Sequence, residues 1–127
     1  MSSVPGHLTV NVLGGRDLPA ITVAHARVSL LASGDGELSM SVVNDGSAPE
    51  HLAFVSTPDA ARTSWRGAVS PAGVELPTGR TVTLGSHGAP QVSLHGVHGI
   101  HAGRAVPFIL GFANVGLVHL QALPPPR

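Results

Sequence analysis

Hydrophobic and polar positions alternate in this chain over short stretches, which are separated by Gly, Pro, Asn and Asp. Residues 38–43 alternate cleanly and stop at Asn44-Asp45-Gly46, a typical turn sequence. No stretch keeps the 3.6-residue period of a helix beyond one turn. The pattern predicts strands at residues 8–13, 21–31, 38–43, 51–56, 62–69, 74–76, 81–84, 91–95, 106–112 and 117–120. Many short strands with turns between them are typical of an all-β sandwich or Greek-key barrel.

Two of these strands make specific predictions about which side chains are buried. In residues 38–43, Met40 is in phase with Leu38 and Val42, so we expect it in the core. In residues 21–31, strict alternation divides the side chains between two faces. One face carries Ile21, Val23, His25, Arg27 and Ser29, and the other carries Thr22, Ala24, Ala26, Val28 and Leu30. The single Trp65 has no aromatic neighbour in the sequence and is expected to pack in the core or at a sheet edge.

Composition narrows the possible functions. The chain has 127 residues, of which 43% are hydrophobic, enough for one packed domain. Seven arginines balance seven acidic residues and there is no lysine, so nothing indicates nucleic-acid binding. The absence of cysteine excludes disulfides, thiolate metal sites and thiol catalysis. No apolar run is long enough to span a bilayer, and Met1–Pro5 lacks the features of a signal peptide.

The sequence contains no recognisable catalytic motif. Ser, His and Asp all occur, but there is no Gly-x-Ser-x-Gly elbow and no phosphate-binding glycine loop followed by a helix. Asp35, Asp45 and Asp59 lie beside Gly or Pro and are interpreted as turn residues. We therefore predict that the protein is not an enzyme.

Histidine is the one residue type that points to chemistry, because the chain has eight. His95, His98 and His101 recur at spacings of three, and His87 lies eight residues before His95. Imidazole nitrogens suit Cu, Zn and Ni. In an extended strand His95 and His98 would point to opposite faces, so they converge only if the intervening glycines let the chain turn. The four histidines are metal-site candidates, and solvated loop residues are the alternative interpretation.

Several segments, in order, resemble the PCu(A)C-type periplasmic copper chaperones, and most closely their actinobacterial lipoprotein branch. The segments are LSMSVVNDG at 38–46, Leu52 with VSTP at 55–58, VELPTGRTVTL at 74–84, VSLHGV at 92–97 and AGRAVPFILGF at 102–112. The resemblance covers roughly residues 22–122. It implies a cupredoxin-like, immunoglobulin-like Greek-key β-sandwich. The expected organisation is an N-terminal extension with a first strand (1–21), the PCu(A)C-like domain (22–122) and a Pro-rich tail (123–127).

The resemblance also implies a Cu(I) site made of His and Met, and this chain departs from it. The late His-x-Met position falls at Gln91-Val92-Ser93, the early histidine position falls near Trp65-Arg66, and Met40 is the only internal methionine. Gln91, Ser93 and His95 share a strand face by the period of two. A nitrogen-rich site containing His95 with His87, His98 or His101 would favour Cu(II) or Zn over Cu(I).

Two functions follow as expectations. The first is a copper-handling protein outside the cytoplasm with a degenerate or relocated His-based site, which serves a respiratory oxidase subunit or another copper protein. The second is a metal-free cupredoxin-like lipoprotein module that binds a protein through an apolar or Arg-bearing patch near Trp65-Arg66. The resemblance implies membrane attachment only through a lipid anchor that this chain does not contain.

Overall fold

The structure is a computed structural model that describes residues 6–11, 20–67, 69–85, 90–101 and 103–125. Every regular element in these ranges is a strand, so the predicted all-β class is confirmed. The described residues contain no helix that is long and apolar enough to cross a membrane. The strands are β1 (Leu8–Asn11), β2 (Ala20–Leu30), β3 (Gly36–Asn44), β4 (Glu50–Ser56), β5 (Ala60–Arg66), β6 (Val74–Leu76), β7 (Thr81–Leu84), β8 (Gln91–Val97), β9 (Val106–Phe112) and β10 (Gly116–Ala122).

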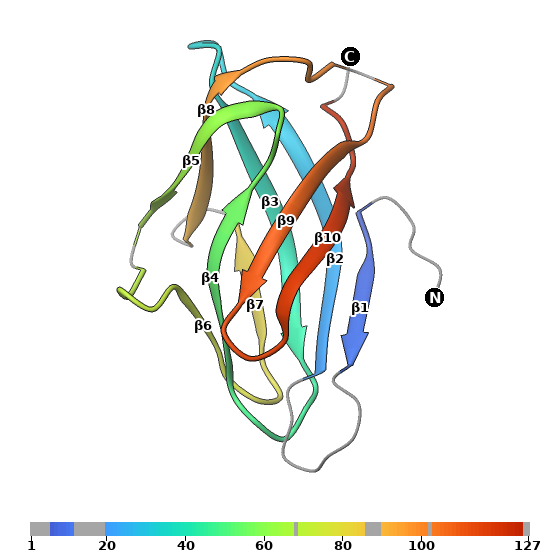
Figure 1. The fold of residues 1–127 in the computed structure, drawn as a ribbon, viewed down its shortest axis with the longest axis vertical. Coiled ribbons are helices and arrows are strands. Elements are labelled where there is room, and N and C mark those ends of the chain that lie inside the picture. Colours follow the sequence, from blue (N-terminus) through green and yellow to red (C-terminus); the bar gives the residue numbers. More distant parts are fainter. Residues whose placement is uncertain (1–5, 12–19, 68, 86–89, 102, 126–127) are drawn as a thin grey trace.

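Two antiparallel sheets pack face to face as a sandwich (Figure 1). The first sheet has the order β1-β2-β3-β8-β5, with β7 also paired to β3, and the second has the order β10-β9-β4-β6. The chain crosses between the sheets five times, after β3, β4, β5, β6 and β8. As a result β8 lies between β3 and β5, two strands that are distant from it in sequence. This placement of β8 determines which residues surround His95, the predicted metal ligand on that strand.

The core fills the space between the sheets, and β3 shows how the sequence places it there. Burial alternates along the whole strand, with Leu38, Met40 and Val42 buried. The prediction for Met40 is therefore confirmed, and its side chain is only 2% exposed. Trp65 is half-buried and packs against the core, as predicted.

The prediction for residues 21–31 is wrong beyond the middle of the strand. Ile21 and Val23 are buried as expected, but Ala26 and Val28 are then buried instead of continuing on the opposite face. The register with β3 shifts between Ala24 and Arg27, so β2 contains a β-bulge. His25 lies in this bulge with a φ of 58°, which is uncommon outside glycine. The extra residue reverses the alternation and turns the second half of the strand over.

Asn44 ends β3 and fastens the two sheets together. Its side chain is fully buried. The Oδ1 atom accepts hydrogen bonds from the backbone N–H groups of Ala20 and Gly46. The Nδ2 group donates to the carbonyls of Ala48 and Leu76, the latter on β6 in the second sheet. The turn signal in the sequence therefore marks a residue that also links the layers.

Candidate functional site

Three of the four predicted metal ligands lie at one end of the sandwich. His95 is on β8, and His98 and His101 follow in the loop that leads to β9. This loop lies at the upper end of the molecule, near the connection from β4 to β5 (Figure 1). His87 falls outside the described residues, so its position is not part of the site described below.

His95 projects from the outer face of the first sheet. Val92 and Leu94 of β8 are buried in the core, which places Gln91, Ser93 and His95 on the opposite face of the strand. The imidazole is 28% exposed. Among the predicted ligands that the structure describes, only His95 belongs to a strand. It pairs with Arg62 of β5, and its neighbour Leu94 pairs with Gly36 of β3.

Both ring nitrogens of His95 have a partner. The Nε2 atom lies 2.9 Å from Oγ of Ser64 on β5. The Nδ1 atom lies 3.5 Å from Oδ2 of Asp35, in the turn before β3. The tautomer with its proton on Nδ1 fits both contacts, because Nε2 then accepts from the Ser64 hydroxyl and Nδ1–H faces the carboxylate. The sequence pattern identifies Asp35 only as a turn residue and does not predict these two contacts of His95.

The loop after β8 turns where its glycines allow it. Gly96 and Gly99 adopt φ values of 64° and 73°, a region that side-chain-bearing residues rarely enter. The backbone N–H of His98 donates to the carbonyl of Asp59 at 2.9 Å. The Asp59 side chain in turn accepts from Arg104 at 2.9 Å, and Arg104 also donates to the Gly99 carbonyl at 2.7 Å. The loop backbone is therefore held against the turn between β4 and β5.

The loop after β8 does not bring together a complete set of metal ligands within the described part of the chain. His98 and His101 are both exposed, while Ile100 between them is buried and anchors the loop. No group of three or more His, Asp or Glu side chains in the described ranges is placed to hold an ion. Met40, the one internal thioether, is enclosed in the core. The available donors at this end are thus imidazole nitrogens, a hydroxyl and the carboxylate of Asp35, which suit Cu(II) or Zn better than Cu(I).

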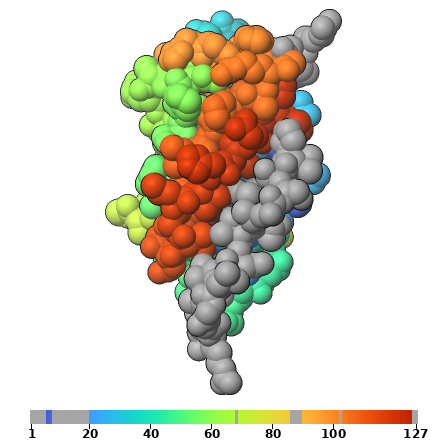
Figure 2. All heavy atoms as spheres, turned by 45° about the vertical axis from the view of Figure 1, so that its right-hand side comes forward, coloured from blue at the N-terminus to red at the C-terminus, as the bar shows by residue number. Residues whose placement is uncertain are grey.

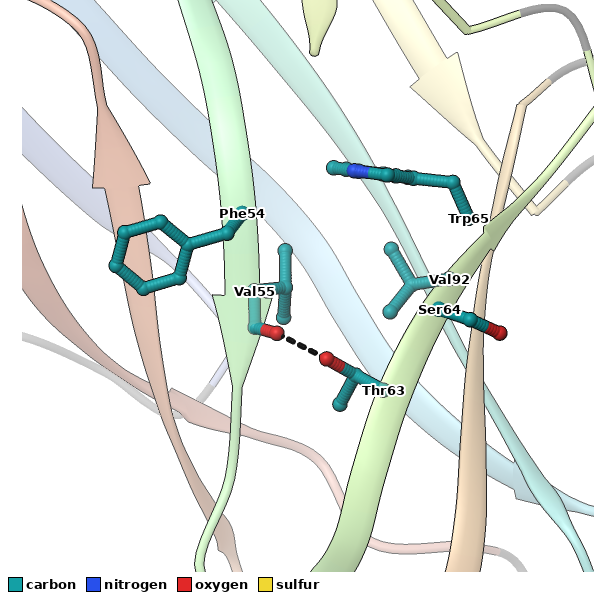
Figure 3. A pocket seen from close by; sticks show the side chains of 6 residues that line it. All are labelled: Phe54, Val55, Thr63, Ser64, Trp65 and Val92. Atoms are coloured by element: carbon teal, nitrogen blue, oxygen red, sulfur yellow. Dashed lines mark hydrogen bonds between the residues drawn. The ribbon is translucent and has the colours of Figure 1, made fainter. Parts of the chain in front are cut away.

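Asp35, His95 and Ser64 have the connectivity of a nucleophilic serine triad. A substrate cavity at the hydroxyl would be needed for such chemistry. A cavity of about 200 Å³ is bordered by Ser64, but the Ser64 side chain points away from it (Figure 3). The hydrogen-bonded chain is therefore not directed at that cavity.

That cavity lies on the open side of the sandwich between β4 and β5. Trp65, Val92, Val55 and Thr63 point toward one another around it (Figure 3). The Thr63 hydroxyl of β5 donates to the carbonyl of Val55 on β4. This hydrogen bond joins the two sheets beside the cavity. Trp65 lies on β5, the edge strand of the first sheet, as predicted. The cavity beside it is lined mainly by apolar side chains and is open to solvent on one side.

An apolar strip crosses the outer face of the second sheet. Phe54 of β4, Gly111 of β9 and Leu117 of β10 are aligned by strand register. The Phe54 ring lies against Gly111, where a Cβ atom would overlap it. Phe54 is 45% exposed and Leu117 is 67% exposed. Figure 2 shows β9 and β10 (orange to red) on the molecular surface below the loop from β8.

Comparison with known proteins gives structural matches only. No protein-family model and no curated protein matches this chain. A copper-bound PCuAC domain from PmoF2 superposes with a TM-score of 0.73 at 24% identity, covering 84% of this chain and 93% of that chain. An apo PCuAC domain from PmoF1 gives 0.73 at 22% identity, covering 94% and 100%. The apo PmoF2 PCuAC domain gives 0.67 at 24% identity, covering 83% and 89%.

Proposed function

We propose that this chain, which has the fold of PCuAC domains, is a copper-handling domain that works outside the cytoplasm. One observation carries the proposal beyond the fold. On β8, His95 presents an imidazole whose Nδ1 faces a carboxylate and whose Nε2 contacts only a hydroxyl, which an incoming ion can replace. Metal-binding histidines commonly have their second nitrogen held in this way.

The proposed cargo is Cu(II), with Zn(II) as the alternative. The chain has glutamine and serine at positions 91 and 93, where the family resemblance implies His and Met. Met40 is buried in the core, so within the described residues the site lacks the soft thioether ligand that selects Cu(I). We propose His95 as the anchoring ligand, with His87, His98 and His101 as the remaining candidates.

The cellular setting is part of the same proposal. A domain of this type would deliver copper to a respiratory oxidase subunit or to another copper protein. Attachment to the membrane would come from a lipid anchor, as the resemblance to the actinobacterial lipoprotein branch implies.

A metal titration of the metal-stripped chain tests this function. We expect one Cu(II) per chain that withstands a competing chelator. Replacement of the proposed anchor, His95→Ala, should weaken binding at least about 100-fold, since even outer partners of a ligand are worth 10- to 100-fold. His119→Ala is the matched control, because His119 is an exposed histidine on β10 in the other sheet.

The two variants make the outcome decisive. If several ions bind weakly per chain, and His95→Ala and His119→Ala reduce binding equally, the ions are held by scattered surface histidines and the proposal is wrong. Cu(I), Cu(II) and Zn(II) measured side by side also test the expected preference for the borderline ions.

The second candidate function is a metal-free module that binds a protein partner. It is favoured by the half-open cavity at Trp65 and by the adjacent exposed Phe54. Photo-crosslinking groups placed at position 54 or at the exposed Glu75 of β6 test it in cells. A crosslink specific to position 54 that persists under a metal chelator would support this function, and equal crosslinking at both positions would contradict it.

A further inference from the structure

We infer that Asp35 and Ser64 set the metal affinity of His95 in opposite directions: Asp35 strengthens it and Ser64 weakens it. The inference rests on the proposed function, because it concerns the same imidazole. Asp35 positions the imidazole ring, and Ser64 competes with the metal ion for its Nε2 atom. The resemblance to copper chaperones implies neither role.

Strand pairing brings these three residues together from distant parts of the chain. Leu94 of β8 pairs with Gly36 of β3, which places the turn containing Asp35 beside His95. On the other side, Ser93 of β8 pairs with Ser64 of β5, which places the serine hydroxyl diagonally across from the imidazole. All three side chains therefore meet on the outer face of the first sheet.

Asp35 acts on the tautomer of His95. A carboxylate oxygen 3.5 Å from Nδ1 favours the form in which Nδ1 carries the proton. In that form Nε2 holds the lone pair and is the atom available to a metal ion. A carboxylate behind a ligating histidine also fixes the orientation of its ring. Because Asp35 is 42% exposed, its effect should lie near the lower end of the known range.

Ser64 competes for the same lone pair. Its hydroxyl lies 2.9 Å from Nε2 and donates to it in the tautomer set by Asp35. A metal ion at Nε2 must displace this hydrogen bond, so the bond lowers the measured affinity. When no metal ion is bound, the Ser64 hydroxyl therefore occupies the lone pair of His95 Nε2.

Ser93 supplies a place for the displaced hydroxyl. Its side chain is 5% exposed, and its Oγ has no hydrogen-bond partner among the residues that the structure describes. A buried hydroxyl without a partner is costly and needs an explanation. Paired residues on adjacent strands have Cβ atoms about 4.5–5.5 Å apart, so the Ser64 hydroxyl can turn to Ser93 when it leaves His95.

Affinity measurements with Cu(II) and Zn(II) against a competing chelator test both roles on the full chain. Asp35→Asn should weaken binding about 10-fold. Ser64→Ala should tighten it by about 2- to 10-fold, the value of one hydrogen bond. The matched controls are Glu75→Gln, an exposed carboxylate on β6 in the second sheet, and Ser41→Ala, a hydroxyl on β3. Both should leave the affinity unchanged.

The affinities separate failure of this inference from failure of the proposed function. If the unmodified chain binds one ion that His95→Ala removes, but Asp35→Asn behaves like Glu75→Gln, the positioning role is wrong. If Ser64→Ala does not differ from Ser41→Ala, the competing role is wrong. If the unmodified chain binds no ion stoichiometrically, the proposed function itself is wrong.

The tautomer of His95 provides a readout that needs no metal. Long-range ¹H–¹⁵N spectra, recorded with the imidazole neutral, should show the proton on Nδ1 in the unmodified chain and in Glu75→Gln. In Asp35→Asn the proportion with the proton on Nε2 should rise. A His95 ring that carries its proton on Nε2 in the unmodified chain would overturn the inference, whatever the metal titration gives.

Discussion

Replacing Glu50 by alanine is expected to lower the free energy of unfolding by about 3 kcal/mol or more. The Glu50 side chain is fully buried at the start of β4. Its carboxylate accepts hydrogen bonds from the backbone N–H groups of His51, Asn114 and Val115 at 2.7–3.0 Å. Asn114 and Val115 form the turn between β9 and β10. Alanine would leave these donors without an acceptor, and each loss costs about 1–3 kcal/mol.

Chemical denaturation of both proteins measures this difference. Glu75→Ala is the matched control, because Glu75 is an exposed glutamate on the neighbouring strand β6. It should leave the denaturation midpoint unchanged. Glu50→Gln should fall between the two, since the amide keeps one acceptor oxygen but turns a donor toward the N–H groups. Equal midpoints for Glu50→Ala and Glu75→Ala would contradict the assigned role of the buried carboxylate.

Gly73→Ala is expected to have the second large effect, a loss of more than about 2 kcal/mol of stability. Gly73 has a φ of 104°, a region that residues with a side chain rarely adopt. An added Cβ would overlap the carbonyl oxygen of Leu52 and lie 2.7 Å from the Cα of Ala53. Both obstacles are backbone atoms of β4, so no side-chain rotation relieves them. The pairing of Leu52 with Val74 of β6 should therefore be lost or displaced.

Gly34→Ala separates the two causes of this effect. Gly34 has a similar φ of 92°, but no heavy atom lies within 4 Å of the place that an added Cβ would take. Its substitution should cost only the backbone preference, about 1–2 kcal/mol. Thermal unfolding of both variants gives the comparison. If the two midpoints fall by the same amount, the close approach of β4 at Gly73 is not what requires glycine.

The β2 strand shows why a correct element can still carry a wrong face assignment. Its existence and length follow from a run of β-branched and alternating residues. The bulge at His25 follows from no local signal in that run. It arises where Ala26 and Val28 pack into a core that other strands complete. A single inserted residue then reverses every later side chain, because the strand period is two.

The residues of the candidate site also separate into those that the sequence predicts and those that only the structure reveals. His95 and the turning glycines at 96 and 99 were found in the sequence, since residue type and spacing are local properties. Asp35 and Ser64 were not, because they lie 60 and 31 residues from His95 and meet it only through strand pairing. Likewise, the burial of Met40 follows from alternation, whereas the partnerless hydroxyl of Ser93 depends on its neighbours on β3 and β5.

The sequence by itself determined the all-β class, most of the strands, the turn at Asn44 and the strand face that His95 shares with Gln91 and Ser93. These features depend on residue preferences and on a period of two, which act over a few residues. The tertiary structure decided that β8 lies between β3 and β5, and therefore which groups contact the His95 ring. Hydrogen bonds between strands join residues regardless of their separation in the chain, so the surroundings of this imidazole are a property of the assembled sheet.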